Sequence, residues 1–190
     1  MTDFNTYLKR IDCTTLRDYI LTHGRRRLFR RGELFLAESQ PCPDMGYVQA
    51  GIFSFTAFNA TEKHSYNVGF SFPGEFVADY PNCIYGLNAQ TGILALTPAE
   101  VYVCPAAPYW QMLDREPSLR EQGRIIAEQL FQQTFQRYLN LYRQTPEERY
   151  RQLLNDYPDL LQLVPLKEIA SYLHITPTHL SRLRKKMNQE

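Results

Sequence analysis

The sequence predicts an α+β protein with a strand-rich N-terminal part, one long helix and a short helical C-terminal part. Three observations support this. Turn residues separate many short apolar runs between Leu28 and Val103, helical periodicity without an internal proline runs from Glu116 to about Tyr142, and residues 166–187 fit two short amphipathic helices. The change from strand-like to helix-like patterns along the chain therefore sets the fold class.

The N-terminal part is predicted to be a short helix followed by β structure. Residues 4–22 carry apolar side chains at helical spacing. After them, the prolines of residues 41–44 and Gly51 interrupt apolar runs of strand length, such as Leu34–Leu36 and Tyr47–Phe58. Many short strands at this spacing favour a closed or double-sheet β architecture.

The long helix carries two apolar stripes. The first consists of Leu119, Gly123, Ile126, Leu130, Thr134 and Leu141, and the second of Phe131, Phe135, Tyr138, Leu139 and Tyr142. Together they are too broad for one contact, so we expect one stripe to face the β part and the other to face a partner. Because Gly123 permits close helix approach, the homodimer interface is assigned to Leu119, Gly123, Ile126, Leu130 and Thr134. The alternative is that this stripe packs within one subunit.

The C-terminal part reads as short helices with clear start signals. Thr145, Pro146 and Glu148 supply an N-cap, a first-turn proline and a capping box. Two later helices have apolar faces formed by Leu166, Ile169, Ala170 and Leu173, and by Leu180, Leu183 and Met187. Thr176 can cap the second of these helices, which leaves His174 in a tight connection. This arrangement is a helix-turn-helix.

The outer face of the last helix has the chemistry of a DNA-reading surface. Arg182 can pair with a guanine edge, and hydroxyl side chains reach bases or phosphates. Residues 166–190 contain five basic side chains and two acidic ones. We therefore predict double-stranded DNA as a partner, contacted by Thr176, Thr178, His179, Ser181, Arg182, Arg184, Lys185 and Lys186, with Arg184 and Lys186 on phosphates at the flanks. The alternative is a solvated basic face.

Composition argues against several other classes. The 190 residues are 44% hydrophobic, and no apolar run of about 18 residues or signal-peptide pattern occurs, so we expect a cytoplasmic protein without membrane contact. The four cysteines form no CxxC pair and the four histidines show no metal-binding spacing, so no metal site is predicted. The missing histidine pattern also argues against a cupin-type β-barrel enzyme, and no enzymatic activity is expected.

The segment 169–182, IASYLHITPTHLSR, resembles the recognition motif of the Crp/Fnr superfamily of bacterial transcription regulators. The segment departs from the family at His174, where the family has Gly, and at Thr178, where it often has Glu. Histidine reaches positive φ more readily than most non-glycine residues, so we expect the turn to be kept at some strain. The change at Thr178 means that the family's DNA sequence preference is not carried over.

Shorter matches extend the resemblance over nearly the whole chain: FRRGE at 29–33, VQAG at 48–51, FPGEF at 72–76 and ALTPAEV at 95–101. The resemblance implies a β-roll (jelly-roll) sensor domain of the cyclic-nucleotide-binding type in residues 1–115. It further implies a dimerisation helix in residues 116–144 and a helix-turn-helix domain in residues 145–190.

The cyclic-nucleotide cassette is degenerate when compared with that family. Relatives that bind cyclic AMP hold its ribose with a carboxylate and its phosphate with an arginine. Here Asp79 stands near the acidic position, but segment 89–92 has no arginine, so a bound phosphate would lose hydrogen bonds worth about 1.5–3 kcal/mol each. We predict that cyclic AMP and cyclic GMP bind poorly or not at all, and we predict no other cofactor. Two interpretations remain for the other cassette residues. They either line a pocket for another small effector or fill the interior of the roll as structural side chains; these residues are Phe76, Asp79, Tyr80, Gln90 and Thr91.

The resulting hypothesis is a homodimeric transcription regulator. Its two recognition helices would lie about 34 Å apart and read a palindromic operator, and an effector or dimer packing would shift the population of that spacing. RNA polymerase is a further expected partner if the protein activates transcription. The alternative is a degenerate sensor that binds a small ligand or a protein and lacks specific DNA recognition, an interpretation supported by His174 and Thr178.

Overall fold

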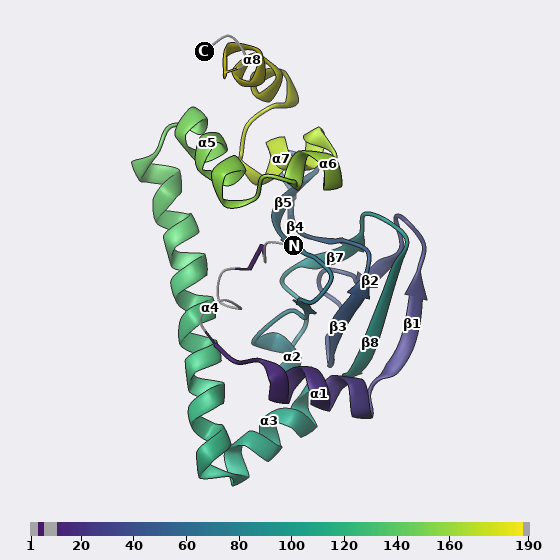
Figure 1. The fold of residues 1–190 in the computed structure, drawn as a ribbon. Coiled ribbons are helices and arrows are strands. Elements are labelled where there is room, and N and C mark those ends of the chain that lie inside the picture. The colour runs from purple at the N-terminus through teal and green to yellow at the C-terminus, as the bar shows by residue number, and fades with distance from the viewer. Residues whose placement is uncertain (1–3, 6–10, 188–190) are drawn as a thin grey trace.

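The computed structural model describes residues 4–5 and 11–187 and has the predicted α+β fold (Figure 1). The first helix, α1 (Thr14–His23), is shorter than the pattern over residues 4–22 suggested. Residues 6–10 lie outside the described part of the chain. Phe4 is not helical; it is buried in a core that it shares with the C-terminal helices.

Two antiparallel four-stranded sheets form the β-roll. The first has the order β1 (Arg25–Phe29), β8 (Ala99–Pro105), β3 (Asp44–Ala50) and β6 (Phe76–Val77). The second has the order β2 (Leu34–Leu36), β7 (Gly92–Ala95), β4 (Phe53–Asn59) and β5 (His64–Ser71). Buried side chains from both sheets form one core, which includes Phe29, Val48, Phe53, Val77, Ile93 and Val101. The predicted double-sheet β architecture is therefore present.

Gly51 separates two strands that the sequence presents as one apolar run. The backbone there has φ 89°, and an added Cβ would lie 2.4 Å from the Ala99 Cβ. Only glycine accommodates both the positive φ and this close approach. The run Tyr47–Phe58 is consequently divided between β3 in one sheet and β4 in the other.

Two helices next to the roll were not predicted: α2 (Asn82–Tyr85) and α3 (Ala106–Arg115). Helix α3 buries Tyr109 and Leu113 in a core that it shares with α1. Pro105 and Pro108 resemble turn signals in the sequence. In the structure Pro105 is the N-cap residue and Pro108 lies in the first turn, where proline is tolerated.

Helix α4 (Pro117–Arg143) runs from α3 along the roll to the C-terminal helices (Figure 1), and the first half of its first stripe packs within its own chain. Gly123 and Ile126 are buried, and Leu119 packs against the α1–α3 core. An added Cβ on Gly123 would lie 3.0 Å from Leu113 Cδ1 and 3.2 Å from Trp110 Cζ3, so this glycine allows α3 to approach. Gly123 and Ile126 are therefore occupied by contacts within the chain, whereas the assignment of Leu119, Leu130 and Thr134 to a dimer interface stays a prediction.

Four of the five residues of the second stripe are exposed, and Leu139 is half-buried. We call Phe131, Phe135, Tyr138 and Tyr142 the aromatic seam; their side chains are 69%, 46%, 52% and 73% exposed. Neighbouring rings along the seam contact one another. From the first stripe, Leu130 is half-buried and Thr134 is exposed. The first half of the first stripe thus packs within the chain, and the exposed aromatic side chains lie on the second stripe.

Four helices follow: α5 (Pro146–Asp156), α6 (Leu160–Leu163), α7 (Leu166–Tyr172) and α8 (Pro177–Met187). The predicted capping box starts α5, because Thr145 Oγ1 accepts from Glu148 N at 3.3 Å and Glu148 Oε2 accepts from Thr145 N at 2.7 Å. Helices α5 to α8 share one core with Phe4 and with roll residues that include Phe70 and Phe72. Among the described residues, no helix has the length and apolar character needed to span a membrane.

Candidate nucleic-acid interface

The turn between α7 and α8 is built around His174. Its φ is 56°, the left-handed conformation expected where related motifs have glycine. His174 N donates to Ser171 O at 2.9 Å and Ile175 N donates to Ala170 O at 3.0 Å, which closes the end of α7. Ala170 is fully buried, so the two helices cross closely. The helix-turn-helix is therefore present, with the strained residue at the predicted position.

Helix α8 begins at a capped N-terminus and has an inner and an outer face. Thr176 Oγ1 accepts from His179 N at 3.1 Å, as expected for an N-cap. Leu180 and Leu183 are buried in the core of the C-terminal helices. Six predicted DNA-contacting residues on the helix have exposed side chains, namely Thr178, His179, Ser181, Arg182, Lys185 and Lys186.

Two flanking cations make contacts within their own domain. Arg184 is half-buried. Burial raises the pKa of the Tyr150 hydroxyl. The Arg184 guanidinium donates a hydrogen bond to that hydroxyl, and its positive charge opposes the rise. Lys186 Nζ lies 2.7 Å from Glu147 Oε2 and lowers the pKa of that carboxyl. Because solvent screens an exposed ion pair, Lys186 can exchange this partner for a phosphate at little cost.

Arg149 of α5 supports the turn and was not identified from the sequence. Its guanidinium donates to Gln144 O at 2.7 Å and to Leu173 O at 3.0 Å, and so joins the end of α4 to the end of α7. Burial lowers the pKa of Arg149. In the sequence, Arg149 lies in the charged first turns of a helix, residues 147–151. Nothing in that pattern indicates that the Arg149 side chain points into the protein.

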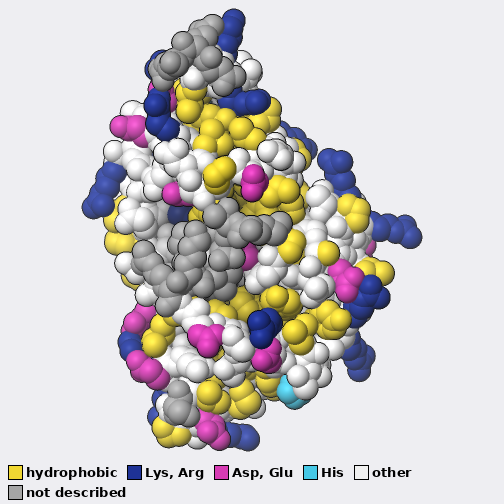
Figure 2. All heavy atoms as spheres, viewed as in Figure 1, with side chains coloured by type: hydrophobic (Ala, Val, Ile, Leu, Met, Phe, Trp, Pro, Cys, Tyr) yellow, Lys and Arg dark blue, Asp and Glu magenta, His cyan; other side chains and the backbone are white. Residues whose placement is uncertain are grey.

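The recognition helix lies at the end of the molecule that is remote from most of the roll (Figure 1). Figure 2 shows Lys and Arg side chains gathered around this end. Arg182 and Lys185 are exposed on α8, and among the described residues neither has an ion-pair partner within 4 Å. The outer face of α8 is therefore a convex, basic surface whose central cations are available to an anionic partner.

The residues of the degenerate cassette mostly contact one another or the roll. Asp79 is 7% exposed and accepts from Asn82 Nδ2 at 2.9 Å, Gln90 N at 2.8 Å and Thr91 Oγ1 at 2.8 Å. Both carboxylate oxygens are thus occupied by the cassette itself, which supports the structural interpretation of Asp79. Tyr80 packs on Trp110, with ring centroids 5.5 Å apart.

Phe76 packs on Tyr47 at 5.7 Å, and Gln90 is exposed. Segment 72–92 contains no Lys, Arg or His that could neutralise a phosphate. Among the described residues, no group of three His, Cys, Asp or Glu side chains lies close enough to hold a metal ion. Segment 72–92 therefore supplies no cationic side chain of its own to a bound phosphate.

Comparison with known proteins identifies the architecture. No family model and no curated protein matches the sequence. Among solved structures, FixK2 from Bradyrhizobium japonicum matches with TM-score 0.75 and 17% identity, covering 87% of this chain and 85% of that chain. The c-di-GMP-responsive global regulator CLP from Xanthomonas campestris matches with TM-score 0.70 and 18% identity, covering 94% and 92%.

A CRP/FNR-family transcriptional regulator from Thermus thermophilus matches with TM-score 0.63 and 16% identity, covering 87% of this chain and 86% of that one. Each of these similarities covers at least 87% of this chain. The fold implied by the sequence resemblance is confirmed: the chain has the fold of the CRP/FNR transcription regulators.

Proposed function

We propose that this protein is a transcription regulator that binds specific double-stranded DNA through α8. The observation that carries the proposal is the exposed face of a capped helix, on which Arg182 lies between Thr178 and Lys185 at helical spacing. Arginine reads guanine edges in the major groove, and lysine at the edge of such a helix contacts phosphate. The proposal assigns no reaction chemistry to the chain.

The protein acts as a homodimer through the aromatic seam of α4. The four seam residues, Phe131, Phe135, Tyr138 and Tyr142, are separated by four, three and four positions, the spacing of a and d residues in a coiled coil. A contiguous exposed aromatic strip of this kind is uncommon on a monomer and favours an interface. A twofold axis along α4 would place two copies of α8 on successive turns of DNA, about 34 Å apart.

Regulation acts through the contacts between the roll and the helix-turn-helix. Asn67 N on β5 donates to Ser171 Oγ on α7 at 2.8 Å, and Arg149 ties α7 to the end of α4. A change in the roll or in the dimer contact therefore alters the position of α8. An effector that prefers one arrangement shifts the population toward it.

Selection of random DNA duplexes by the purified protein tests the proposal. The wild type is expected to enrich a palindrome with half-sites about one helical turn apart. Arg182→Ala should lose that enrichment, whereas Arg31→Ala, which removes an exposed arginine from the β1–β2 turn of the roll, should retain it. Enrichment that is unchanged in Arg182→Ala would reject α8 as the reading helix. Sequence-blind binding by the wild type would favour a sensor without specific DNA recognition.

A further inference from the structure

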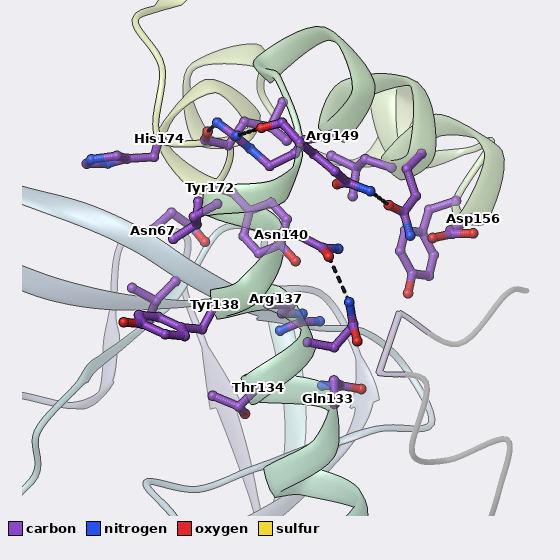
Figure 3. A pocket seen from close by; sticks show the side chains of 18 of the residues that line it. Asn67, Gln133, Thr134, Arg137, Tyr138, Asn140, Arg149, Asp156, Tyr172 and His174 are labelled. Atoms are coloured by element: carbon purple, nitrogen blue, oxygen red, sulfur yellow. Dashed lines mark hydrogen bonds between the residues drawn. The ribbon is translucent and has the colours of Figure 1, made fainter.

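A cavity of about 570 Å³ lies at the junction of the roll, the long helix and the helix-turn-helix. We call it the junction cavity; β5, the C-terminal half of α4, α5 and α7 all contribute to its wall (Figure 3). It is separate from the cassette around Asp79. Its volume is within the range of about 300–1,000 Å³ that is usual for small-molecule sites.

The wall of the junction cavity is positively charged and rich in amides. Arg137 and Arg149 line it, against one carboxylate, that of Asp156. Arg137 lies 5.0 Å from the ring centre of Phe4 and 5.5 Å from that of Tyr172, contacts that hold its charge in place without neutralising it. Among the described residues, no carboxylate oxygen lies within 4 Å of the Arg137 guanidinium. This cation is therefore available to an anion inside the cavity.

Three buried polar atoms around the junction cavity have no partner within the described structure. Two are donors, Asn67 Nδ2 and Arg149 Nε, and one is an acceptor, Gln144 Oε1. Asn67 is only 3% exposed, and its Oδ1 already accepts from Gly69 N at 3.0 Å. Leaving a buried donor without a partner costs about 1–3 kcal/mol, so a ligand that supplies acceptors to these donors gains affinity.

We propose that the junction cavity binds a small organic anion that also carries hydroxyl or amino groups. Its carboxylate or phosphate oxygens would face Arg137 and accept from Asn67 Nδ2 and Arg149 Nε. A hydroxyl or amino group would donate to Gln144 Oε1. Because the walls come from the roll and from the helix-turn-helix, the bound anion fixes the angle between them. That regulatory consequence rests on the proposed function, whereas binding of the anion does not.

Isothermal titration of the full chain without DNA tests the proposal. Citrate serves as a carboxylate probe, glycerol 3-phosphate as a phosphate probe and glycerol as the uncharged control, all at one ionic strength. At least one anion is expected to bind and glycerol is not. The better of the two probes identifies which anionic group the site prefers.

Two variants locate the site. Arg137→Gln removes the cation that has no carboxylate partner. Asn67→Asp keeps the oxygen that accepts from Gly69 N and replaces Asn67 Nδ2, the donor without a partner, by a negatively charged oxygen. Each should weaken binding of the anion about tenfold or more. Arg143→Gln removes an exposed arginine of the same helix that does not line the cavity, and it should bind as the wild type does. Binding of neither anion, or equal binding by wild type, Arg137→Gln and Asn67→Asp, would overturn the proposal, whatever the outcome of the DNA selection.

Discussion

Replacement of Phe4 by alanine should destabilise the contact between the roll and the C-terminal helices. Phe4 is 1% exposed although it lies near the start of the chain. Its ring meets Phe70 and Phe72 of the roll on one side and Tyr157 and Tyr172 of the C-terminal helices on the other. Alanine would remove these contacts and leave a cavity between the two parts.

The magnitude follows from the burial of Phe4. Truncation of a buried phenylalanine to alanine costs about 3–5 kcal/mol. The ring centroids of its four aromatic neighbours lie between 4.6 Å and 5.6 Å away, within the range where aromatic pairs add to the energy of burial. For a protein of 190 residues, each kcal/mol lowers Tm by about 2–4 °C, so we expect Tm to fall by about 6–20 °C.

Thermal unfolding followed by circular dichroism measures this effect. The control is Phe58→Ala, because Phe58 lies on β4 and is 54% exposed. That substitution should change the free energy of unfolding by less than about 1 kcal/mol. A Tm of Phe4→Ala that matches the Tm of Phe58→Ala would refute the idea that the N-terminal segment joins the two parts.

Three further predictions concern the dimer, the capping box and a buried carboxyl. Phe135→Glu places a charge in the middle of the aromatic seam and should convert the dimer to a monomer in sedimentation velocity, whereas Arg143→Glu near the end of the same helix should leave it dimeric. Thr145→Ala removes the N-cap of α5 and should lower the free energy of unfolding in urea by about 0.5–2 kcal/mol; an unchanged midpoint would contradict the cap's role. Burial raises the pKa of Glu75 above 4.5, although Asn5 and Phe72 N–H groups donate to it. The folded state therefore favours the protonated carboxyl. The Tm of the wild type minus the Tm of Glu75→Gln should consequently fall as pH rises from about 4 through the raised pKa. A difference that stays constant with pH would argue against a raised pKa of Glu75.

The periodic and capped elements were the ones that the sequence allowed us to predict. Helix α4, the capping box at Thr145 and the turn at His174 depend on local patterns, and the structure contains all three. Local patterns do not report which of two apolar stripes meets the rest of the chain. Gly123 permits close approach of any helix. In the structure the helix that approaches it is α3, which was not predicted from the sequence.

The contacts at the junction could not be predicted either, because local patterns do not report long-range partners. Phe4, Asn67 and Arg149 are ordinary residues of a chain start, a strand and a charged helix, and each becomes distinctive only through partners far along the sequence. From the sequence, Asp79 could either bind a ligand or bond to its own loop, and the three donors seen in the structure support the second interpretation. Long-range partners of single polar residues leave no periodic signal in one sequence.

The most direct test of the account compares the affinity of wild type, Arg182→Ala and Lys185→Ala for the selected duplex and for a scrambled one at several salt concentrations. Arg182→Ala should lose about 1–3 kcal/mol of binding on the selected duplex alone, because arginine reads a base there. Lys185→Ala should weaken binding to both duplexes alike and reduce the salt slope by about one, as expected for a phosphate contact. If Arg182→Ala distinguishes the two duplexes as well as the wild type does, α8 is not the helix that reads DNA, and the central claim fails.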